Sequence, residues 1–337
     1  MKKIEVLALA CDNGSCGNWR ILQPFKKFSS PDIHVEPMLG NEYLMHCYGY
    51  YDAIIIQRPI AGCVDWIRSL IASGKKVFIE VDDMYPLEDP ENPTYEMFKP
   101  GSEAANHILE CIRISHGVMT NTAALVSHYS QYNENVGLFP NAIDFENPIY
   151  KQPRKRLTKK LTMFWSGSSG HGSNLSIITD AINASLKKFP HLALVMCSSP
   201  HNPDLLNMFE GAPDQKIAIP PCSFEEYGNL HSLADFVLAP IKDNSYNRAK
   251  SNIRLLEPAV WSVASIASAV GEYEEFAQKS NMPRASNTQD WIDCIKVFID
   301  SKSFRLQCGQ RANNLAKLAY DLKQVNSDRE QWLLNLL

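Results

Sequence analysis

Short runs of apolar residues recur along the chain, separated by stretches with helical spacing of apolar positions. The runs are continuous rather than alternating, which is typical of strands that helices cover on both faces. This pattern predicts an α/β protein with parallel sheets. The ten predicted strands are residues 4–10, 53–57, 76–81, 117–120, 136–139, 162–165, 193–197, 216–219, 235–239 and 264–268.

The alternation of strands and helices continues through both halves of the chain, whose 337 residues suit two domains. We expect an N-terminal Rossmann-like domain over 1–150 and a C-terminal one over 161–320. The basic segment 151–160 indicates a linker, with a membrane-surface or polyanion patch as the alternative. Helices are predicted at 290–299, 303–322 and 327–337. Segment 321–337 is expected to pack back on the first domain or to serve as an amphipathic partner helix.

Composition describes an ordinary soluble protein, with 45% hydrophobic and 21% charged residues. A net charge of −4 gives no global support for nucleic-acid binding. Nine cysteines without a CxxC pair fit reduced thiols in the cytoplasm. No apolar run approaches the roughly 18 residues that span a bilayer. The first eleven residues superficially resemble a lipoprotein signal, but Glu5 interrupts a short apolar part, so a first strand is favoured.

Two segments of the first half carry candidate chemistry. The loop after the first strand contains Gly14 and Gly17, which allow close approach of a ligand, although GxGxxG spacing is missing. Arg20, on the helical turn that follows, faces a cleft or merely the solvent. After the third strand, Glu80, Asp82 and a neighbouring Asp83 can supply a general base or metal ligands; ordinary caps and loop charges are the alternative. A proline-rich stretch, 86–100, follows as a candidate mobile loop.

Two segments of the second half indicate phosphate binding. The turn 166–174 is rich in glycine and serine and lies between a strand and a helix, as phosphate-binding loops do; plain flexibility is the alternative. In segment 246–257, Arg248 and Lys250 precede a helix that Ser251 or Asn252 can cap. A helix N-terminus with two cations suits a phosphate or diphosphate, and Glu257 can accept hydrogen bonds from sugar hydroxyls. Solvated surface charges are the alternative.

Taken together, these segments resemble the GT-B glycosyltransferases, specifically the group-1 (GT4-like) family with its short bacterial and phage members. The matched segments cover nearly the whole chain and are individually weak. They are Gly17-Asn18-Trp19-Arg20-Ile21-Leu22-Gln23-Pro24, Ile56-Gln57-Arg58-Pro59, Lys76-Val77-Phe78-Ile79-Glu80-Val81-Asp82-Asp83, and residues 139–144, 164–167 and 238–257. The resemblance implies two Rossmann-like domains facing a central cleft, with the nucleotide sugar in the second domain and the acceptor in the first.

The resemblance also implies residue roles. Arg248 and Lys250 match the cations at the donor diphosphate, where they would aid catalysis, and Glu257 matches the glutamate that holds the donor ribose. The remaining implied donor contacts are Gly14, Gly17, Ser166, Gly167, Ser168, His171, Ser251 and Asn252. The implied acceptor contacts are Arg20, Arg58, Asp82 and Asp83, with either aspartate as the base of an inverting reaction. No obligatory metal or cofactor is implied, and the nucleotide sugar is the co-substrate.

Three departures from the family pattern stand out. Ala249 replaces the first glutamate of the E-x7-E motif, which usually approaches the donor sugar. Pro258 removes an N–H inside the helix and should bend or shorten it. Residues 261–264 replace the usual Gly-x-Pro before the next strand. The sugar contacts and the stereochemistry therefore do not carry over from the family.

The acceptor is open at this level. A bacterial surface glycan or a protein is the default expectation, and hydroxymethylated pyrimidines in DNA are the phage-type alternative. The non-catalytic alternative, which Ala249 motivates, is a protein that binds a nucleotide sugar or glycan without turnover. No stretch indicates a pocket specific for one nucleobase.

Overall fold

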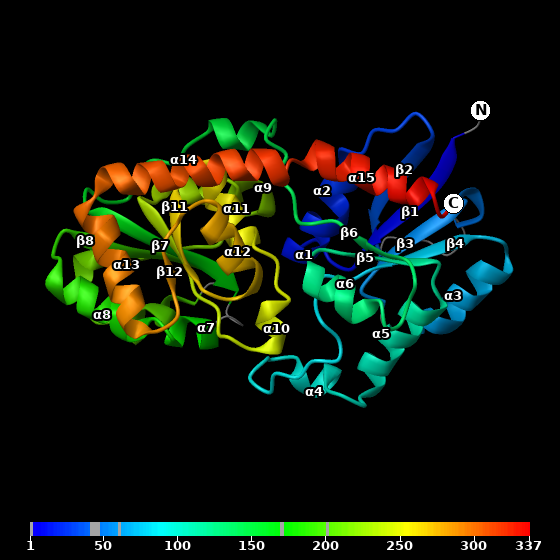
Figure 1. Ribbon diagram of the computed structural model, residues 1–337, viewed down its shortest axis with the longest axis horizontal. Coiled ribbons are helices and arrows are strands. Elements are labelled where there is room, and N and C mark those ends of the chain that lie inside the picture. Colours follow the sequence, from blue (N-terminus) through cyan, green and yellow to red (C-terminus); the bar gives the residue numbers. More distant parts are fainter. Residues whose placement is uncertain (1–2, 41–47, 60–61, 169–171, 200–201) are drawn as a thin grey trace. The chain divides into compact units, whose positions relative to one another are not determined.

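The computed structural model describes residues 3–40, 48–59, 62–168, 172–199 and 202–337. The chain folds into two compact units, each built on a six-stranded parallel sheet (Figure 1). Unit 1 comprises Met1–Ala142, Ala249–Ser251 and Asp321–Leu337, and unit 2 comprises Ile143–Arg248 and Asn252–Tyr320. The chain therefore passes between the units four times, and three residues of the segment 246–257 belong to unit 1.

In unit 1 the strand order is β2-β1-β3-β4-β5-β6. The strands are β1 (Ile4–Ala10), β2 (Ile33–Leu39), β3 (Ala53–Gln57), β4 (Lys76–Glu80), β5 (Gly117–Thr120) and β6 (Val136–Leu138). The helices are α1 (Ser15–Gly17), the π-helix η1 (Asn18–Leu22), α2 (Gln23–Lys26), η2 (Tyr48–Tyr50), α3 (Cys63–Ala72), α4 (Tyr95–Phe98), α5 (Glu103–Ile114), α6 (Ala123–Tyr129) and α15 (Leu322–Leu334). Every residue of β3 is buried, as expected for a strand covered on both faces.

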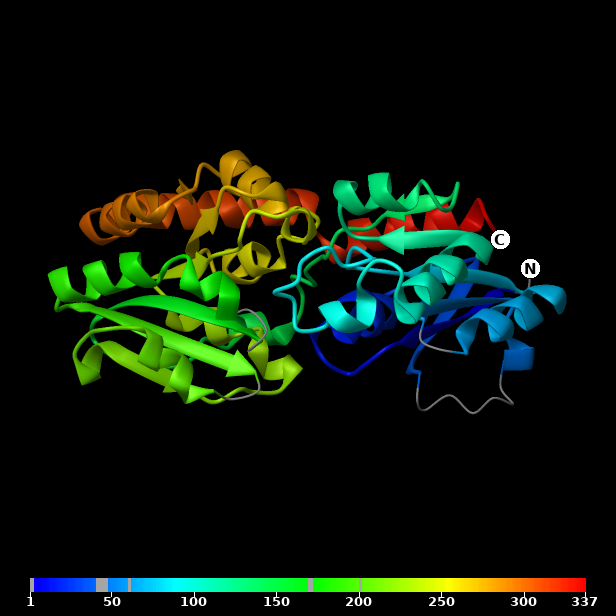
Figure 2. The same ribbon diagram turned by 90° about the horizontal axis from the view of Figure 1, so that it is seen from below.

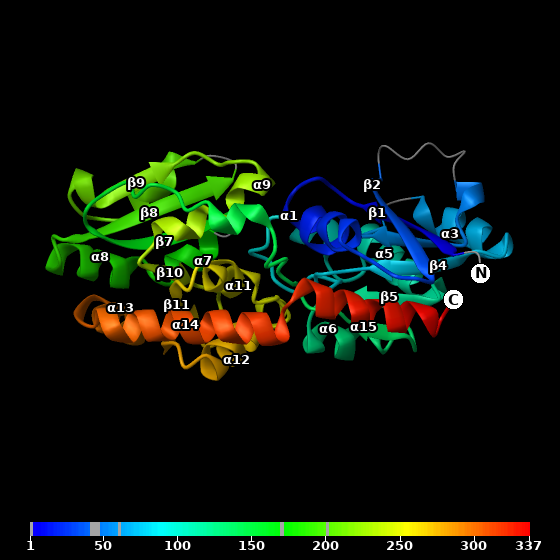
Figure 3. The same ribbon diagram turned by 90° about the horizontal axis from the view of Figure 1, so that it is seen from above.

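The C-terminal helix α15 completes the core of unit 1 (Figure 3). Leu322 and Leu333 are buried in the same cluster as the strand residues. The ring of Trp332 packs 5.5 Å, centre to centre, from both Phe78 and Phe139. Residues separated by more than 170 positions thus share one core, and helix α15 is an integral part of unit 1.

In unit 2 the strand order is β12-β11-β10-β7-β8-β9. The strands are β7 (Leu161–Ser168), β8 (Leu192–Ser199), β9 (Lys216–Ile219), β10 (Phe236–Ala239), β11 (Ala264–Ser268) and β12 (Arg284–Ala285). The helices are η3 (Pro148–Lys151), α7 (Gly172–Ser176), α8 (Thr179–Lys188), η5 (Pro203–Met208), η6 (Pro213–Gln215), α9 (Phe224–Tyr227), η7 (Leu230–Leu233), α10 (Ser245–Arg248), α11 (Ile253–Val260), α12 (Gly271–Lys279), α13 (Thr288–Asp300) and α14 (Lys302–Ala319). Helices α13 and α14 run along one side of the strands (Figure 2, orange).

Both sheets contain a topological switch point. In unit 2 the chain leaves β7 toward β8 and β9 on one side, and returns to β10, β11 and β12 on the other. In open parallel sheets such a reversal leaves a crevice at the carboxyl ends of the two central strands, where ligands bind. The turns after β7 and β10 therefore have the position of a ligand site in unit 2, and those after β1 and β3 have it in unit 1.

All ten predicted strands are present, with ends shifted by at most three residues. Two strands were not predicted. Strand β2 contains Pro37 and alternates in exposure because it lies at the sheet edge, and β12 has only two residues. The predicted helix 303–322 instead ends at Ala319, because Asp321 caps a new helix by accepting hydrogen bonds from the backbone N–H groups of Lys323 and Gln324.

The basic segment 151–160 is fastened to unit 2 by its own side chains. Arg156 donates to Asp235 at 2.5 Å, and Lys160 pairs with Asp214 at 2.7 Å. The backbone N–H of Arg154 donates to the Ser232 hydroxyl at 2.9 Å. In the part of the chain that the structure describes, no helix has the length and apolar character needed to cross a membrane.

Candidate functional site

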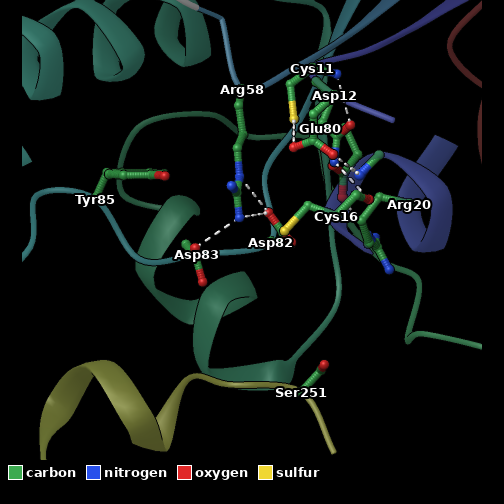
Figure 4. Close-up of polar contacts among 12 residues, drawn as sticks. Cys11, Asp12, Cys16, Arg20, Arg58, Glu80, Asp82, Asp83, Tyr85 and Ser251 are labelled. Carbon is green, nitrogen blue, oxygen red and sulfur yellow. Dashed lines mark hydrogen bonds and ion pairs between the residues drawn. The ribbon is translucent and has the colours of Figure 1, made fainter. Parts of the chain in front are cut away.

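Unit 1 gathers charged side chains at the carboxyl ends of its central strands β3 and β4 (Figure 4). Arg58 follows β3 and donates from Nε to Asp82 at 2.8 Å and from Nη2 to Asp83 at 2.8 Å. Lys250 pairs with the second aspartate, Asp83. The structure therefore brings together four predicted site residues in one network of two cations and two carboxylates.

The backbone at Arg58 is held in an unusual conformation. Its φ is +44°, in the left-handed region that costs a non-glycine residue roughly 1–3 kcal/mol. Its N–H donates to the Glu80 carbonyl at 2.9 Å, and its side chain is fixed by the two aspartates. Burial alone would lower the pKa of Arg58, but the Asp82 and Asp83 carboxylates outweigh burial and raise it well above the ordinary range. Strained backbone that surrounding contacts maintain is typical of functional sites.

Arg20 lies in the core of unit 1, with 1% of its surface exposed. It donates to Glu80 at 2.5 Å, to the Phe139 carbonyl at 2.7 Å and to Asn141 at 3.0 Å. Burial raises the pKa of Glu80 to about 7, and Arg20 opposes that rise. The sequence predicts an acceptor contact for Arg20, whereas its observed contacts tie three segments of unit 1 together.

The loop after β1 is shaped by Asp12. Its Oδ1 accepts hydrogen bonds from the backbone N–H groups of Gly14 at 2.8 Å and Gly17 at 3.2 Å. A Cβ at Gly17 would lie 1.7 Å from the Asp12 carbonyl oxygen, so the loop can close only over a glycine. The φ of Gly17 is −61°, which any residue can adopt. Glycine is therefore needed here because a side chain would not fit, not because of the backbone conformation.

Gly17→Ala is expected to lower the free energy of unfolding by about 1–3 kcal/mol, the usual range for overpacking. The added methyl meets backbone atoms that cannot rotate away. Gly14→Ala is the matched control, because its Cβ would lie 3.1 Å from Asp12 Oδ1, a contact that a small shift relieves, whereas the contact at Gly17 is 1.7 Å. Urea unfolding of both variants checks this, and equal losses would contradict the steric account.

Unit 2 holds a buried polar cluster at the carboxyl end of β7. The Ser166 hydroxyl lies 2.7 Å from the Tyr227 hydroxyl and 3.4 Å from Nε2 of His231. The same Nε2 lies 3.8 Å from a carboxyl oxygen of Glu257. His231 is 1% exposed and Glu257 6% exposed. The cluster comes from β7, α9, η7 and α11, and it stands at the switch point of the sheet.

Burial makes this cluster electrically neutral near pH 7. It raises the pKa of Glu257 to about 8, although Arg254 and the Tyr227 hydroxyl oppose the rise. It also lowers the pKa of His231 to about 3, with a further contribution from Arg254. Neutral hydroxyl, imidazole and carboxyl groups donate and accept hydrogen bonds without an ionic partner. Such groups suit the hydroxyls of a sugar or ribose.

The raised pKa of Glu257 has a measurable consequence for stability. The folded state keeps a proton that the unfolded state loses above its ordinary pKa of 4.5, up to about 8. The free energy of unfolding of the wild type should therefore fall, relative to Glu257→Gln, as the pH rises from about 4.5 to 8. The slope is at most about 1.4 kcal/mol per pH unit. Urea unfolding of both proteins across this range checks it, and a constant difference would exclude a buried protonated Glu257.

The segment 246–257 is divided between the two units. Arg248, in unit 2, is exposed and donates twice to the Asp243 carboxylate, at 2.5 and 2.9 Å. Lys250, in unit 1, pairs with Asp83. The sequence predicts both cations at one diphosphate, whereas each of them has a carboxylate partner within its own unit.

The start of helix α11 differs from the expected cap. Asn252 occupies the N-cap position, but its side chain forms no cap; it donates to the Tyr320 hydroxyl at 2.7 Å. Ser251 belongs to unit 1, where its hydroxyl accepts from Asn141 at 2.8 Å. Pro258 lies inside the helix, which ends two residues later.

The predicted turn 166–174 is only partly described. Ser168 ends strand β7, and His171 lies outside the described residues. Gly167 is in contact with Arg254, since a Cβ there would lie 2.5 Å from Nη2 of the guanidinium. Sequence reasoning missed Arg254, along with Tyr227 and His231. The sequence spacing could have indicated Arg254, because it precedes Glu257 by one helical turn and such residues lie on the same helix face.

Among the residues that the structure describes, no group of three or more His, Cys, Asp and Glu side chains has the arrangement of a metal site. Asp82 and Asp83, which the sequence offers as possible metal ligands, are instead paired with Arg58 and Lys250. The carboxylate charges in this network are therefore already balanced by protein cations.

No protein-family model matches the chain, and no curated protein sequence matches it. Solved structures match it over nearly its whole length. HepE from Anabaena in complex with UDP-glucose is 13% identical, with a TM-score of 0.68, covering 98% of this chain and 100% of that one. A glycosyltransferase from Rickettsia africae is 10% identical, with a TM-score of 0.65 and coverage of 100% and 99%. Sucrose-phosphate synthase from Thermosynechococcus elongatus is 8% identical, with a TM-score of 0.65 and coverage of 99% of both chains.

At these identities the likeness establishes the fold. The chain has the GT-B fold, with two Rossmann-like units on parallel sheets, and the fold predicted from the sequence is confirmed.

Proposed function

We propose that this protein is a glycosyltransferase of the GT4-like kind, which moves a sugar from a nucleoside-diphosphate donor to an acceptor hydroxyl. The observation that carries the proposal is the neutral cluster of Ser166, Tyr227, His231 and Glu257, all but Tyr227 buried, at the switch point of unit 2. The GT-B fold supports it, because HepE, which shares that fold, binds UDP-glucose.

In this proposal unit 2 binds the donor. Glu257 holds the ribose hydroxyls, and the turn with Ser166, Gly167, Ser168 and His171 lies beside the nucleotide. These roles agree with the position of β7 at the switch point, where parallel sheets bind ligands. Departure of a nucleoside diphosphate creates negative charge, which fixed cations and backbone N–H groups stabilise without a metal.

Unit 1 binds the acceptor through Arg58, Asp82 and Asp83, with the loop at Gly14 and Gly17 close to the reacting groups. The two aspartates accept hydrogen bonds from Arg58, and Asp83 also pairs with Lys250. Protein cations therefore hold both carboxylates of this network. The network favours a retaining reaction, in which the donor phosphate takes the proton of the acceptor hydroxyl.

We propose a glycan or protein acceptor in the cytoplasm. The buried cysteines Cys111, Cys197 and Cys308 are free thiols, which fits a reducing compartment. A DNA acceptor has less support, because Arg156 and Lys160 of the basic segment are already paired with carboxylates of unit 2.

One observation favours a second candidate function, binding of a nucleotide sugar without turnover. Ala249 stands where the family supplies a carboxylate near the donor sugar, and its backbone carbonyl accepts a hydrogen bond from Thr122. The test is release of free nucleoside diphosphate from UDP-, GDP-, ADP- and dTDP-sugars, with and without simple sugar acceptors. Time-dependent release supports the transferase, and binding without release supports the second candidate.

A further inference from the structure

The turn after β7 contains no lysine or arginine. Residues 166–174, which begin in β7, read Ser-Gly-Ser-Ser-Gly-His-Gly-Ser-Asn, so the sequence of this segment carries no permanent positive charge. A cation reaches the turn from helix α11. The Arg254 guanidinium lies against Gly167, where a Cβ would be 2.5 Å from Nη2 and 3.2 Å from Cζ. Because any larger residue at 167 would displace this guanidinium, the glycine and the arginine form one structural unit.

The Arg254 guanidinium is held in place, but one of its nitrogen atoms has no hydrogen-bond acceptor among the described residues. Its Cζ lies 5.7 Å from the centre of the Trp165 ring, which holds it by a cation–π contact. Its Nη1 is buried, and no hydrogen-bond acceptor for it occurs in the described parts of the chain. Trp165 Nε1 and His231 Nδ1 are buried and without a hydrogen-bond partner there as well. Three nitrogen atoms of one cluster thus lack partners, and those of Arg254 and Trp165 can only donate.

Among the described residues, no carboxylate forms an ion pair with Arg254. Glu257, one helical turn further on, is the acidic group whose proton Arg254 influences, but burial keeps that carboxyl protonated near pH 7. Arg248, by contrast, has its Nε–Nη2 edge engaged by both carboxylate oxygens of Asp243. An arginine at a switch point whose buried Nη1 has no acceptor among the described residues is suited to an oxygen of a phosphate group.

We infer that Arg254 is the cation that binds the diphosphate of the nucleotide in unit 2, in place of the Arg248 and Lys250 pair that the sequence indicates. This inference rests on the proposed function and deepens it by naming the residue that binds the anion. The ligand class is a nucleoside diphosphate, because the neutral sugar-binding cluster adjoins the cation in the same unit.

The test is calorimetric titration of UDP, GDP, ADP and dTDP, and of their nucleosides, into wild type, Arg254→Gln, Arg254→Lys and the control Arg284→Gln. Arg284 is exposed on β12 of the same unit. Arg254→Gln should weaken diphosphate binding about tenfold to 100-fold, the range for charged hydrogen bonds, and leave nucleoside binding nearly unchanged. Arg254→Lys should recover part of the affinity, and Arg284→Gln should bind like wild type.

A second variant keeps Arg254 but moves its guanidinium. In Gly167→Ala the added Cβ would lie 2.5 Å from Nη2 of Arg254 and 3.0 Å from the Trp165 ring, so it should displace the guanidinium and weaken diphosphate binding. Thermal unfolding of the variant checks that it is folded. In the double variant with Arg254→Gln, the two losses should overlap rather than add. Additive losses would contradict the inference.

The outcomes separate the inference from the proposed function. If wild type binds none of the four nucleoside diphosphates, the proposed function fails. Suppose that wild type binds one nucleoside diphosphate and Arg254→Gln binds it equally well, or that Arg254→Gln weakens nucleoside binding as much as diphosphate binding. Either result would overturn the role of Arg254 while the proposed function stands.

Discussion

Arg20→Gln is expected to lower the free energy of unfolding by about 3–5 kcal/mol, the cost of removing one partner of a buried ion pair. Arg20 and Glu80 are 1% and 0% exposed, and the variant leaves the carboxyl of Glu80 without its cation. The pKa of Glu80 is about 7 in the wild type, so the loss should be larger at pH 8 than at pH 5.5, where the carboxyl is neutral. Urea unfolding at both pH values measures it.

Arg68→Gln is the matched control. Arg68 also pairs with carboxylates, at 2.9 Å to Glu110 and 3.4 Å to Asp65, but 56% of its side chain is exposed. Exposed pairs of this kind contribute about 0–1 kcal/mol. If the free energy of unfolding falls equally in the two variants, the buried Arg20–Glu80 pair stabilises unit 1 no more than an exposed pair does.

The second large effect is on ligand binding. Glu257→Ala is expected to weaken donor binding by about tenfold, because the variant loses the hydrogen bonds of the neutral carboxyl to both ribose hydroxyls, each worth about 0.5–1.5 kcal/mol. Glu257→Gln keeps the shape and one acceptor and should lose less. Isothermal titration with the nucleotide sugar that binds wild type measures both losses.

Glu225→Ala controls for the loss of a carboxylate as such, since Glu225 is exposed on helix α9 in the same unit. It should bind donor like the wild type. If Glu257→Ala is folded and its donor affinity is unchanged, the ribose contact proposed for Glu257 is excluded.

The sequence predicted the two sheets well because their strands are buried on both faces. A continuous apolar run such as residues 53–57 has few other interpretations, and the observed strand β3 has the same limits. Strand β2 was missed because it lies at the sheet edge and alternates in exposure around Pro37. Its sequence therefore lacks the continuous apolar run that identified the predicted strands.

The candidate site was less predictable, since its contacts join distant segments. Arg20 looked like a cleft residue, but its partners Glu80 and Asn141 lie 60 and 121 positions away. The cluster around Ser166 takes Tyr227 and His231 from short helices that carry no sequence signature. These residues come together only in the folded chain. Sequence spacing could have identified only Arg254, which lies one helical turn before Glu257 on the same helix.

The segment 246–257 shows both a part of the site that the sequence predicted and a part that it did not. Its position after β10 agrees with the switch point, and Glu257 lies in the buried cluster. Its two predicted cations are divided, with Arg248 on Asp243 and Lys250 on Asp83. A linear motif shows which residues are adjacent in sequence but cannot show which unit each side chain joins.

The most direct test of the central claim is titration of the full-length chain with UDP-glucose, GDP-mannose, ADP-glucose and dTDP-glucose, by calorimetry and thermal unfolding. If unit 2 is a donor site, one of these should bind saturably at one site per chain and raise the midpoint of unfolding. The matching free nucleoside diphosphate should compete for that site. Absence of saturable binding by all four sugars and by their diphosphates would contradict the account.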